Sequence, residues 1–361
     1  MKKYLRLLGL LLVLGLFIMG QAGCPGCGGG IGSVGFGKIS GVVHGSIPNT
    51  LICKATVTAT GGGRTYSTLT DGTGRYELGV PAGTYTVTAS RETFNNATSS
   101  ITVNSDETKT QDFNLTTGSG GTITGLPDIS YSYLWAETCP SEIDIRSLKF
   151  NPSKGKKLEF NPNSLPIASR NSGDYRSYTL LQINIAPSDD TGIKGIRFYR
   201  SDNPNGPFIL VDFSTLISYG GIGIDTDVTS GTTRYYTFSF FGDSGESALQ
   251  QLKSIEIPEP CILSSPTNEA TVGPTPTFSW NAVPNADGYY IEVREKTDSG
   301  WNYIWGTSTT NTSITYGGNA LESGKTYVWD VTASKTTTEE TYTSGFASSS
   351  YPREFSVSTS L

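Results

Sequence analysis

The stretch TDGTGRYELGVPAGTYTVTAS, residues Thr70–Ser90, decides the fold of this chain. Residues 75–78 and 84–90 alternate polar and apolar side chains, the period of two that places successive side chains on opposite faces of a β-strand. A turn containing glycine precedes each segment, and we expect Gly83 in the second turn to adopt positive φ. The stretch therefore predicts two strands joined by a turn, as in a β-sandwich.

The motif D-G-x-G-x-Y at residues 71–76, followed by P-A-G-x-Y-x-V at residues 81–87, resembles the carboxypeptidase regulatory-like domain. The resemblance implies a small β-sandwich over residues 38–116, related in fold to starch-binding and transthyretin-like domains. In carboxypeptidases this domain accompanies a zinc peptidase. The chain contains no H-x-x-E motif, so the resemblance does not imply peptidase activity.

The composition is typical of an extracellular β-protein. Of the 361 residues only 16% are charged and 43 are glycine, and the length suits two or three domains. The net charge is −6, and loss of the three cations near the N-terminus would lower it to about −9. Because an acidic chain repels phosphate backbones, we do not expect nucleic acid as a partner.

Residues 1–23 have the pattern of an export signal, with three cations, an apolar run and small residues before Cys24. The run of about 13 residues is shorter than the roughly 20 of a membrane-spanning helix, so we expect cleavage. Ala22-Gly23-Cys24 resembles a bacterial lipoprotein box, although Gln21 stands where that family usually has leucine. Ordinary signal cleavage is the alternative.

The lipoprotein resemblance implies that Cys24 carries membrane lipid and that residues 24–37 form a glycine-rich tether. It also implies a location on the cell membrane or outer membrane, facing the extracytoplasmic side. Cys24 and Cys27 form a C-x-x-C pair, but no βαβ pattern surrounds them, so a redox role is disfavoured.

Two further segments, separated from the first domain by a linker at residues 117–125, resemble bacterial fibronectin type III domains. Residues 126–258 contain a Tyr-Arg-Ser hairpin at 199–201 and a Gly-Glu-Ser turn at 245–247, although the approach over residues 129–175 carries no signature. Residues 259–361 contain Trp280 and alternating aromatic and apolar residues at 327–331, which we predict to be core. The chain is therefore predicted to be all-β, with three consecutive β-sandwich modules that each enclose their own core.

No residue pattern predicts a catalytic or metal site, and we expect no cofactor. The chain's only histidine, His44, lies in a predicted strand, which disfavours both a hydrolase triad and a zinc site. Asp189-Asp190 and Asp225-Thr226-Asp227 lack the spacing of a calcium loop, so they are interpreted as turn residues. In an oxidising compartment Cys139 and Cys261 could close the second module with a disulfide bond.

The best binding candidate is aromatic. Trp301, Tyr303 and Trp305 alternate along one predicted strand, which would place them on one face where sugar rings could stack. The alternative is that the three rings close the core of the third module. The sequence favours core packing without excluding an exposed surface.

We therefore predict a non-enzymatic, membrane-anchored surface lipoprotein that acts as a structural, adhesive or binding scaffold. The alternative is a carbohydrate-binding accessory protein of a polysaccharide-degrading system. The expected partners are membrane lipid through Cys24 and either a polysaccharide or a cell-surface protein. An enzyme would need a cleft that the sequence does not indicate.

Overall fold

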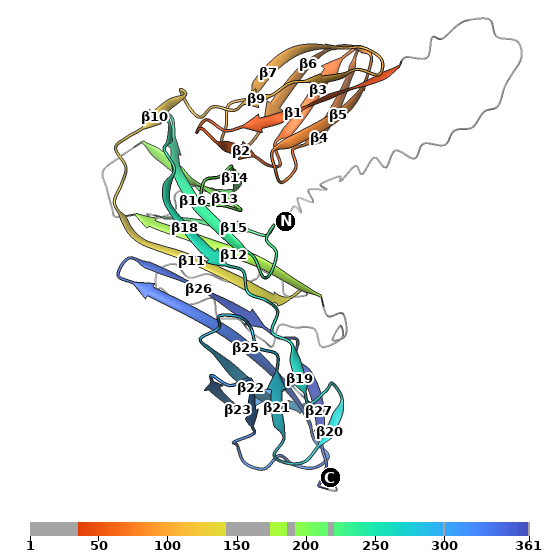
Figure 1. Cartoon of the computed structure of the whole chain (residues 1–361), viewed down its shortest axis with the longest axis vertical. Coiled ribbons are helices and arrows are strands. Elements are labelled where there is room, and N and C mark those ends of the chain that lie inside the picture. Colours follow the sequence, from red (N-terminus) through yellow and green to blue (C-terminus); the bar gives the residue numbers. More distant parts are fainter. Residues whose placement is uncertain (1–34, 142–173, 186–191, 216–219, 299, 360–361) are drawn as a thin grey trace, which may run out of the picture. The chain divides into compact units, whose positions relative to one another are not determined.

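The computed structural model describes residues 35–141, 174–185, 192–215, 220–298 and 300–359 (Figure 1). In these ranges the regular structure is β-strand, which confirms the predicted all-β class. The same ranges contain no helix that is long and apolar enough to cross a membrane. The predicted signal, the tether, Cys24 and Cys27 lie outside the described residues, and so do Asp189 and Asp190.

The first segment forms two packed sheets. Antiparallel β1 and β5 belong to one sheet, and the order β4-β3-β6-β7 makes the other. Alternating side chains such as Ile39, Val57 and Val87 are fully buried between the sheets. The strands are β1 (Phe36–His44), β2 (Thr50–Ile52), β3 (Thr56–Gly61), β4 (Arg64–Leu69), β5 (Arg75–Pro81), β6 (Gly83–Ser90), β7 (Ala97–Val103), β8 (Thr108–Thr110) and β9 (Phe113–Asn114).

The two turns of the opening stretch differ from each other. Gly74 has a φ of 73°, as the D-G-x-G turn requires, and the Asp71 carboxylate accepts hydrogen bonds from the backbone N–H groups of Thr73 and Arg75. Gly83 is not at positive φ, so that expectation is wrong. Gly83 is instead the first residue of β6 and pairs with Val103, which holds its backbone in the extended conformation of a strand.

The second segment contains strands of two sheets. β12 lies between β11 and β15 in one sheet, and β13 lies between β14 and β16 in the other. The long β11 forms the start of the region 129–175, which has no sequence signature, and the long β12 begins at its last residue. The strands are β10 (Gly121–Ile123), β11 (Ile129–Pro140), β12 (Tyr175–Ile185), β13 (Ile193–Ser201), β14 (Phe208–Thr215), β15 (Gly220–Asp225), β16 (Thr233–Gly242), β17 (Gly245–Ser247) and β18 (Gln250–Glu256).

The third segment packs the three-stranded sheet β19-β21-β24 against longer strands. β22 lies between β23 and β25, and β25 pairs on its other side with β26 and β27. The strands are β19 (Leu263–Ser265), β20 (Ala270–Val272), β21 (Thr277–Trp280), β22 (Gly288–Thr297), β23 (Gly300–Thr309), β24 (Ser313–Thr315), β25 (Thr326–Glu339), β26 (Tyr342–Ser349) and β27 (Arg353–Val357).

Two sheets continue from one predicted module into the next. β2 pairs in parallel with β14, from Thr50 opposite Phe208 to Ile52 opposite Leu210. β11 pairs in parallel with β26 over seven residue pairs, beginning at Ser132. Pairing satisfies backbone groups that an edge strand would otherwise expose. The predicted modules are therefore joined through backbone hydrogen bonds.

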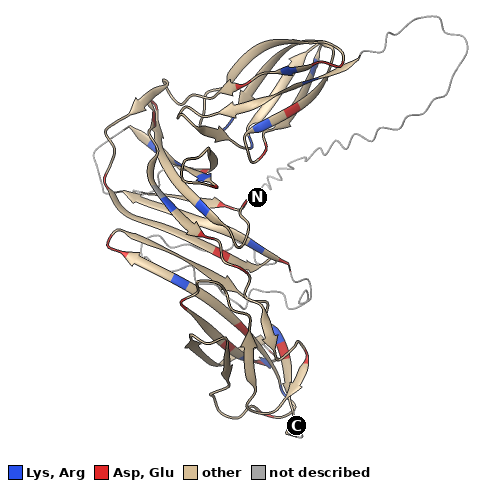
Figure 2. Ribbon diagram, in the orientation of Figure 1, with Lys and Arg blue, Asp and Glu red and all other residues tan. Residues whose placement is uncertain are grey.

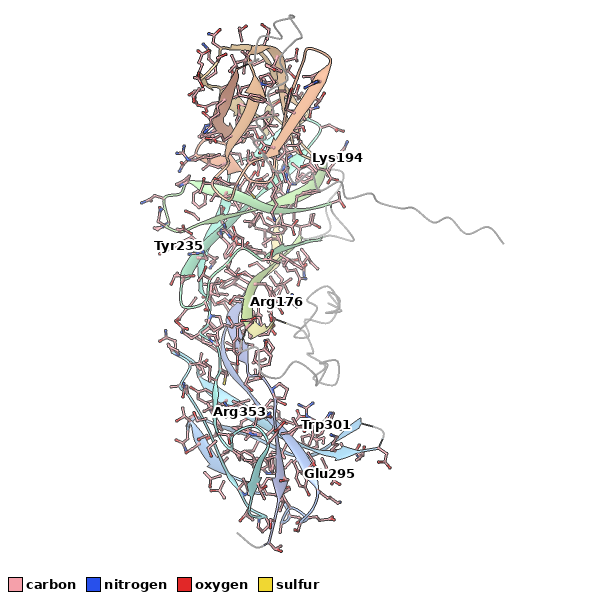
Figure 3. All side chains as sticks on the ribbon, turned by 90° about the vertical axis from the view of Figure 1, so that its right-hand side faces the viewer. Arg176, Lys194, Tyr235, Glu295, Trp301 and Arg353 are labelled. Carbon is pink, nitrogen blue, oxygen red and sulfur yellow. The ribbon has the colours of Figure 1, made fainter. Side chains whose placement is uncertain are left out.

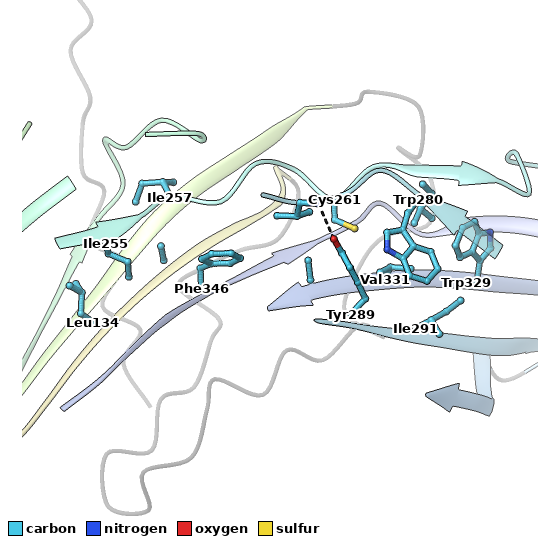
Figure 4. Close-up of a cluster of buried hydrophobic side chains, with 14 of the residues drawn as sticks. Leu134, Ile255, Ile257, Cys261, Trp280, Tyr289, Ile291, Trp329, Val331 and Phe346 are labelled. Carbon is cyan, nitrogen blue, oxygen red and sulfur yellow. Dashed lines mark hydrogen bonds between the residues drawn. The ribbon is translucent and has the colours of Figure 1, made fainter. Parts of the chain in front are cut away.

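The hydrophobic core also crosses the predicted boundaries. One buried cluster runs from Leu134 and Ile255 of the second segment through Cys261 to Trp280 and Trp329 of the third (Figure 4). The core of the first segment includes two buried side chains of the second, Tyr199 and Leu210. The expectation that each module encloses its own core is therefore wrong, because neighbouring segments cover one another's apolar ends.

Candidate functional site

A β-bulge in β23 separates the three aromatic residues that the sequence placed on one face. The pairing of β23 with β22 shifts by one residue at Ile304. An extra residue in one strand reverses the faces of the side chains beyond it. Trp305 therefore lies on one face of the sheet, while Tyr303 and Trp301 lie on the other.

Trp305 belongs to the core. Its ring centroid lies 5.1 Å from that of Tyr316 and 6.4 Å from that of Phe278, and the side chain packs against the main buried cluster. The half-buried Trp305 ring therefore packs against core aromatics instead of continuing the surface of Tyr303. Trp305 therefore follows the core-packing alternative and does not share an exposed surface with Tyr303.

On the opposite face, two tyrosines are exposed side by side. Tyr303 is 58% exposed and Tyr290 of β22 is 43% exposed. Partial burial and the neighbouring Tyr303 hydroxyl raise the pKa of Tyr290 to about 12. Gly306 makes room for the ring, because a Cβ there would lie 2.5 Å from the Tyr290 hydroxyl oxygen.

Trp301 extends this surface along β23. It pairs with Lys296, two residues beyond the pair of Tyr303 with Arg294, so Trp301 and Tyr303 share a face. The Lys296 ammonium lies 5.8 Å from the centre of the Trp301 ring. Figure 3 labels Trp301 close to the connection between β22 and β23. We call Tyr290, Trp301 and Tyr303 the aromatic face.

Charged groups lie beside the aromatic face on β22 and β25. Arg294 is 3% exposed and forms an ion pair with Asp330 of β25, and its Nε lies 3.4 Å from Glu292 Oε1. Burial raises the pKa of Asp330, although Arg294 opposes the change. Burial and the neighbouring Asp330 raise the pKa of Glu292. The carboxylates remain partly accessible, with 21% of Glu292 and 17% of Asp330 exposed.

Tyr290 is the residue of this surface that sequence reasoning missed. The signal was present, because Tyr289, Tyr290 and Ile291 alternate between buried and exposed positions along β22. Tyr289 points into the core, where its hydroxyl accepts the Val283 N–H, so Tyr290 must point outward. The approach of Tyr290 to Tyr303 depends on the register between β22 and β23, which cannot be predicted from the sequence of either strand alone.

The cysteines predicted to form a bridge are free. Cys53, Cys139 and Cys261, the cysteines within the described ranges, are all buried and free. Cys261 lies in the core cluster, whereas Cys139 follows Thr138 on β11 and points to the other face of the sheet. The structure thus places the two sulfurs on opposite sides of a sheet and does not contain the predicted bridge. Burial raises the pKa of both thiols to about 12.

The carboxylates considered for calcium serve as partners of an arginine. Asp225 accepts two hydrogen bonds of 3.1 Å from Arg200 and one of 2.8 Å from Tyr236, and Asp227 lies 3.0 Å from the same arginine. A cavity of about 230 Å³ beside them is lined by Arg200, Asp227, Asp71 and Lys54, among others. Among the residues that the structure describes, no cluster of three potential metal ligands occurs. His44 ends β1, within a strand as predicted.

A buried ion pair of the second segment lies in contact with the first segment. Arg197 of β13 and Glu246 of β17 are almost completely buried, with 2.6 Å between Nη1 and Oε2. Tyr199 and Ser239 each donate a 2.6 Å hydrogen bond to Glu246. From the first segment, Ser46 donates a hydrogen bond to Glu246 and the Phe94 ring lies 3.6 Å from the Arg197 guanidinium carbon. The Gly-Glu-Ser turn thus contributes its carboxylate to a junction.

Another buried carboxylate, Glu137 of β11, was not singled out by its sequence pattern. The Tyr178 hydroxyl donates a 2.7 Å hydrogen bond to it, and burial raises the pKa of Glu137 to about 7.

Acidic and basic residues are otherwise spread over the strands rather than gathered on one of them (Figure 2).

Family models match two parts of the chain. Residues 38–116 match the carboxypeptidase regulatory-like domain, which confirms the predicted resemblance. Residues 267–350 match the Rha78A-like N-terminal immunoglobulin domain. Immunoglobulin and fibronectin type III domains share the two-sheet sandwich architecture predicted for this segment.

Solved structures with low identity resemble parts of the chain. A DUF3823 family protein from Bacteroides ovatus is 11% identical, with 61% of this chain and 98% of that chain covered and a TM-score of 0.25. The FN1–FN3 domains of chicken CNTN1 are 10% identical, with 84% and 90% covered and a TM-score of 0.30. A candidate carbohydrate binding protein from Bacteroides uniformis is 12% identical, with 61% and 98% covered and a TM-score of 0.26.

No curated protein matches the chain. By the family models, the chain combines a segment similar to the carboxypeptidase regulatory-like domain with a later segment similar to an immunoglobulin domain.

Proposed function

We propose that this chain is a non-enzymatic surface lipoprotein that is anchored through Cys24 and binds carbohydrate through its aromatic face. The observation that carries the proposal is the pair of exposed tyrosines, Tyr290 and Tyr303, which lie on the same face of the sheet as Trp301. Flat aromatic rings offer apolar faces on which sugar rings stack, while their hydroxyls remain available for polar contacts.

The polar groups around the aromatic face support the same proposal. The side chains of Glu292 and Asp330 are partly exposed, and their carboxylates can accept hydrogen bonds from sugar hydroxyls. The hydroxyls of Tyr290 and Tyr303 can both donate and accept. A surface that combines apolar ring faces with such groups suits a ligand that is itself apolar on one side and hydroxylated at its edges.

Two of the buried carboxylates, Asp225 and Glu246, have partners that favour a structural role for them over catalysis. Asp225 is paired with Arg200 and Glu246 with Arg197, and tyrosine hydroxyls donate hydrogen bonds to both carboxylates. A carboxylate whose acceptor sites are occupied by an arginine and hydroxyl groups is a poor general acid or base, because its charge is already compensated. These pairs stabilise the fold.

A scaffold role is the second function, and the Arg197–Glu246 junction favours it. The ion pair, the parallel pairing of β2 with β14 and the buried Tyr199 together fix the first segment against the second. Segments joined in this way can hold a binding surface at a constant position relative to the anchor.

The carbohydrate proposal can be tested by binding of the detergent-solubilised full chain to insoluble glycans. Tyr303→Ala and Tyr290→Ala should each lower retention, because each removes an exposed stacking ring. Phe36→Ala is the matched control, since Phe36 is 60% exposed but lies on β1, outside the aromatic face. Equal retention of all four proteins would contradict the proposal.

The anchor is tested separately. The wild-type chain should partition into a detergent phase, and Cys24→Ala should no longer be processed at that site. Equal solubility of both proteins after export would contradict the lipoprotein assignment without affecting the carbohydrate proposal.

A further inference from the structure

We infer that the aromatic face binds the interior of a neutral, linear polysaccharide, and neither a chain end nor an acidic glycan. This inference rests on the proposed carbohydrate function and adds the class of ligand. It follows from the arrangement of the rings along one strand and from which charges beside them are accessible.

The rings form a row. Trp301 and Tyr303 lie two residues apart on β23, and the ring of Tyr290 crosses Gly306, three residues further along the same strand. At about 3.3 Å for each strand residue, the row extends over roughly 15 Å. A single sugar ring covers only part of such a row, whereas successive units of one chain can contact all of it.

The row is open rather than enclosed. Tyr303 and Tyr290 are 58% and 43% exposed, so a ligand lies across the rings instead of entering a pocket between them. Recognition of a chain end requires groups that surround the terminal sugar. A row made of two exposed tyrosines and the half-buried Trp301 recognises a repeating chain by the number of its contacts.

The accessible charges disfavour an acidic ligand. The formal charges beside the aromatic face sum to zero, but the charged side chains are not equally exposed to a ligand. The four residues are Glu292, Arg294, Lys296 and Asp330. The cation Arg294 is 3% exposed, whereas its partners Glu292 and Asp330 are 21% and 17% exposed. The tyrosines are therefore bordered by two partly exposed acidic side chains, whose negative charge repels uronates and sulfates and which accept hydrogen bonds from neutral hydroxyls.

Lys296 is the cation that could attract an acidic glycan. Its position at one end of the row limits that attraction. Its ammonium lies 5.8 Å from the centre of the Trp301 ring, at the end of the row away from Tyr290. An ammonium near a ring face is attracted to the π electrons, which holds it at that end. The carboxylates Glu292 and Asp330 beside the tyrosines therefore determine the discrimination between neutral and acidic glycans.

Native affinity electrophoresis of the detergent-solubilised full chain tests the inference. The gels contain neutral polymers (hydroxyethylcellulose, glucomannan, xylan, laminarin or soluble starch) or the acidic polymers alginate and polygalacturonate. We expect retardation by at least one neutral polymer, weakened about tenfold by Tyr303→Ala and unchanged by Phe36→Ala. The matching monosaccharide should compete at least a hundredfold less well than the polymer, by mass.

Glu292→Gln gives a second measurement that does not depend on losing a ring. It removes one accessible negative charge, so we expect neutral-polymer binding to change less than threefold and weak binding to alginate to increase. Loss of neutral-polymer binding in Glu292→Gln with an unchanged melting temperature would show that charge at Glu292 is required and would overturn the argument from repulsion.

The outcomes separate the inference from the proposed function. Tyr303-dependent binding to acidic polymers that disappears at high salt, or monosaccharide competition equal to that of the polymer, would overturn the inference and leave the carbohydrate function intact. No Tyr303-dependent binding to any polymer or monosaccharide would overturn both.

Discussion

Gly74 is the position of the D-G-x-G motif at which the backbone conformation favours glycine. It has a φ of 73°, and a Cβ there would lie 3.1 Å from Leu51 Cβ and 3.2 Å from the Val43 carbonyl oxygen. An L-residue is disfavoured in this conformation, and its neighbours leave little space. Gly83, in the companion turn, meets neither restriction.

Gly74→Val should therefore destabilise the full chain by about 1–3 kcal/mol, through backbone strain and the close contacts. Gly83→Ala is the matched control, because its nearest neighbour would be a Tyr85 ring atom at an ordinary 3.5 Å. Urea denaturation followed by circular dichroism provides the measurement. Equal midpoints for Gly74→Val and the wild type would contradict the turn assignment.

Glu137 should make stability depend on pH. Burial raises its pKa to about 7 in the folded chain, whereas an exposed glutamate titrates near 4.3. The folded state therefore binds the Glu137 proton more tightly than the unfolded state does. The resulting stabilisation of the fold is fully present below about pH 4 and is lost as pH rises to about 7.

We expect Glu137→Gln to remove this pH dependence and to gain stability relative to the wild type at pH 8, by up to about 3 kcal/mol. The free energy of unfolding of both proteins, measured from pH 4 to pH 8, tests the expectation. A difference between the two proteins that stays constant over this range would show that Glu137 titrates normally.

At the scale of the element, β23 illustrates how one extra residue changes what a strand presents. The shift at Ile304 places Trp305 against Tyr316 in the core and leaves Tyr303 exposed. Side chains in contact with the core contribute packing energy, whereas a largely exposed ring contributes little.

Trp305→Ala should consequently lower the free energy of unfolding by about 2–4 kcal/mol, while Tyr303→Ala should change it by less than about 0.5 kcal/mol. Thermal denaturation of the two variants makes the comparison. If Tyr303→Ala proved the more destabilising variant, the bulge would be misplaced and the aromatic face would be part of the core.

The buried Arg197–Glu246 ion pair joins two elements, β13 and β17. Removal of Glu246 would leave the buried Arg197 charge without its carboxylate, which costs about 3–5 kcal/mol in buried pairs of this kind. We expect Glu246→Ala to be strongly destabilising, and the Arg197→Ala/Glu246→Ala double variant to be less destabilised than the sum of the single variants. Additive effects in a double-mutant cycle would argue against direct coupling.

At the scale of the whole molecule, the shared core links the second and third segments. Leu134, Cys261 and Trp329 belong to one buried cluster, and β11 and β26 belong to one sheet. Elements that bury one another's apolar surface unfold together. This organisation differs from modules that are connected only by a linker.

Calorimetry of the full chain should accordingly show residues 126–258 and 259–361 melting in one transition. Phe346→Ala on β26, at the boundary of the segments, should shift that whole transition to lower temperature, because Phe346 packs in the shared cluster. Spectroscopic probes on the two segments that report separate midpoints would contradict the shared core.

The sequence by itself determined the all-β class and the regulatory-like domain. Alternation with a period of two and the D-G-x-G turn are local properties, readable from a few neighbouring residues. For the same reason the sequence identified Trp280, Tyr327 and Trp329 as core, and all three are buried. The exposure of Tyr303 was one of two alternatives that local pattern left open.

Only the tertiary structure decided which residues meet. The bulge at Ile304 depends on pairing with β22, and the approach of Tyr290 to Tyr303 depends on the absence of a side chain at Gly306. The free thiols of Cys139 and Cys261 and the Arg197–Glu246 junction likewise depend on which faces and edges come together. Register and contact between distant strands arise from burial of shared apolar surface, a property that no short stretch of sequence contains.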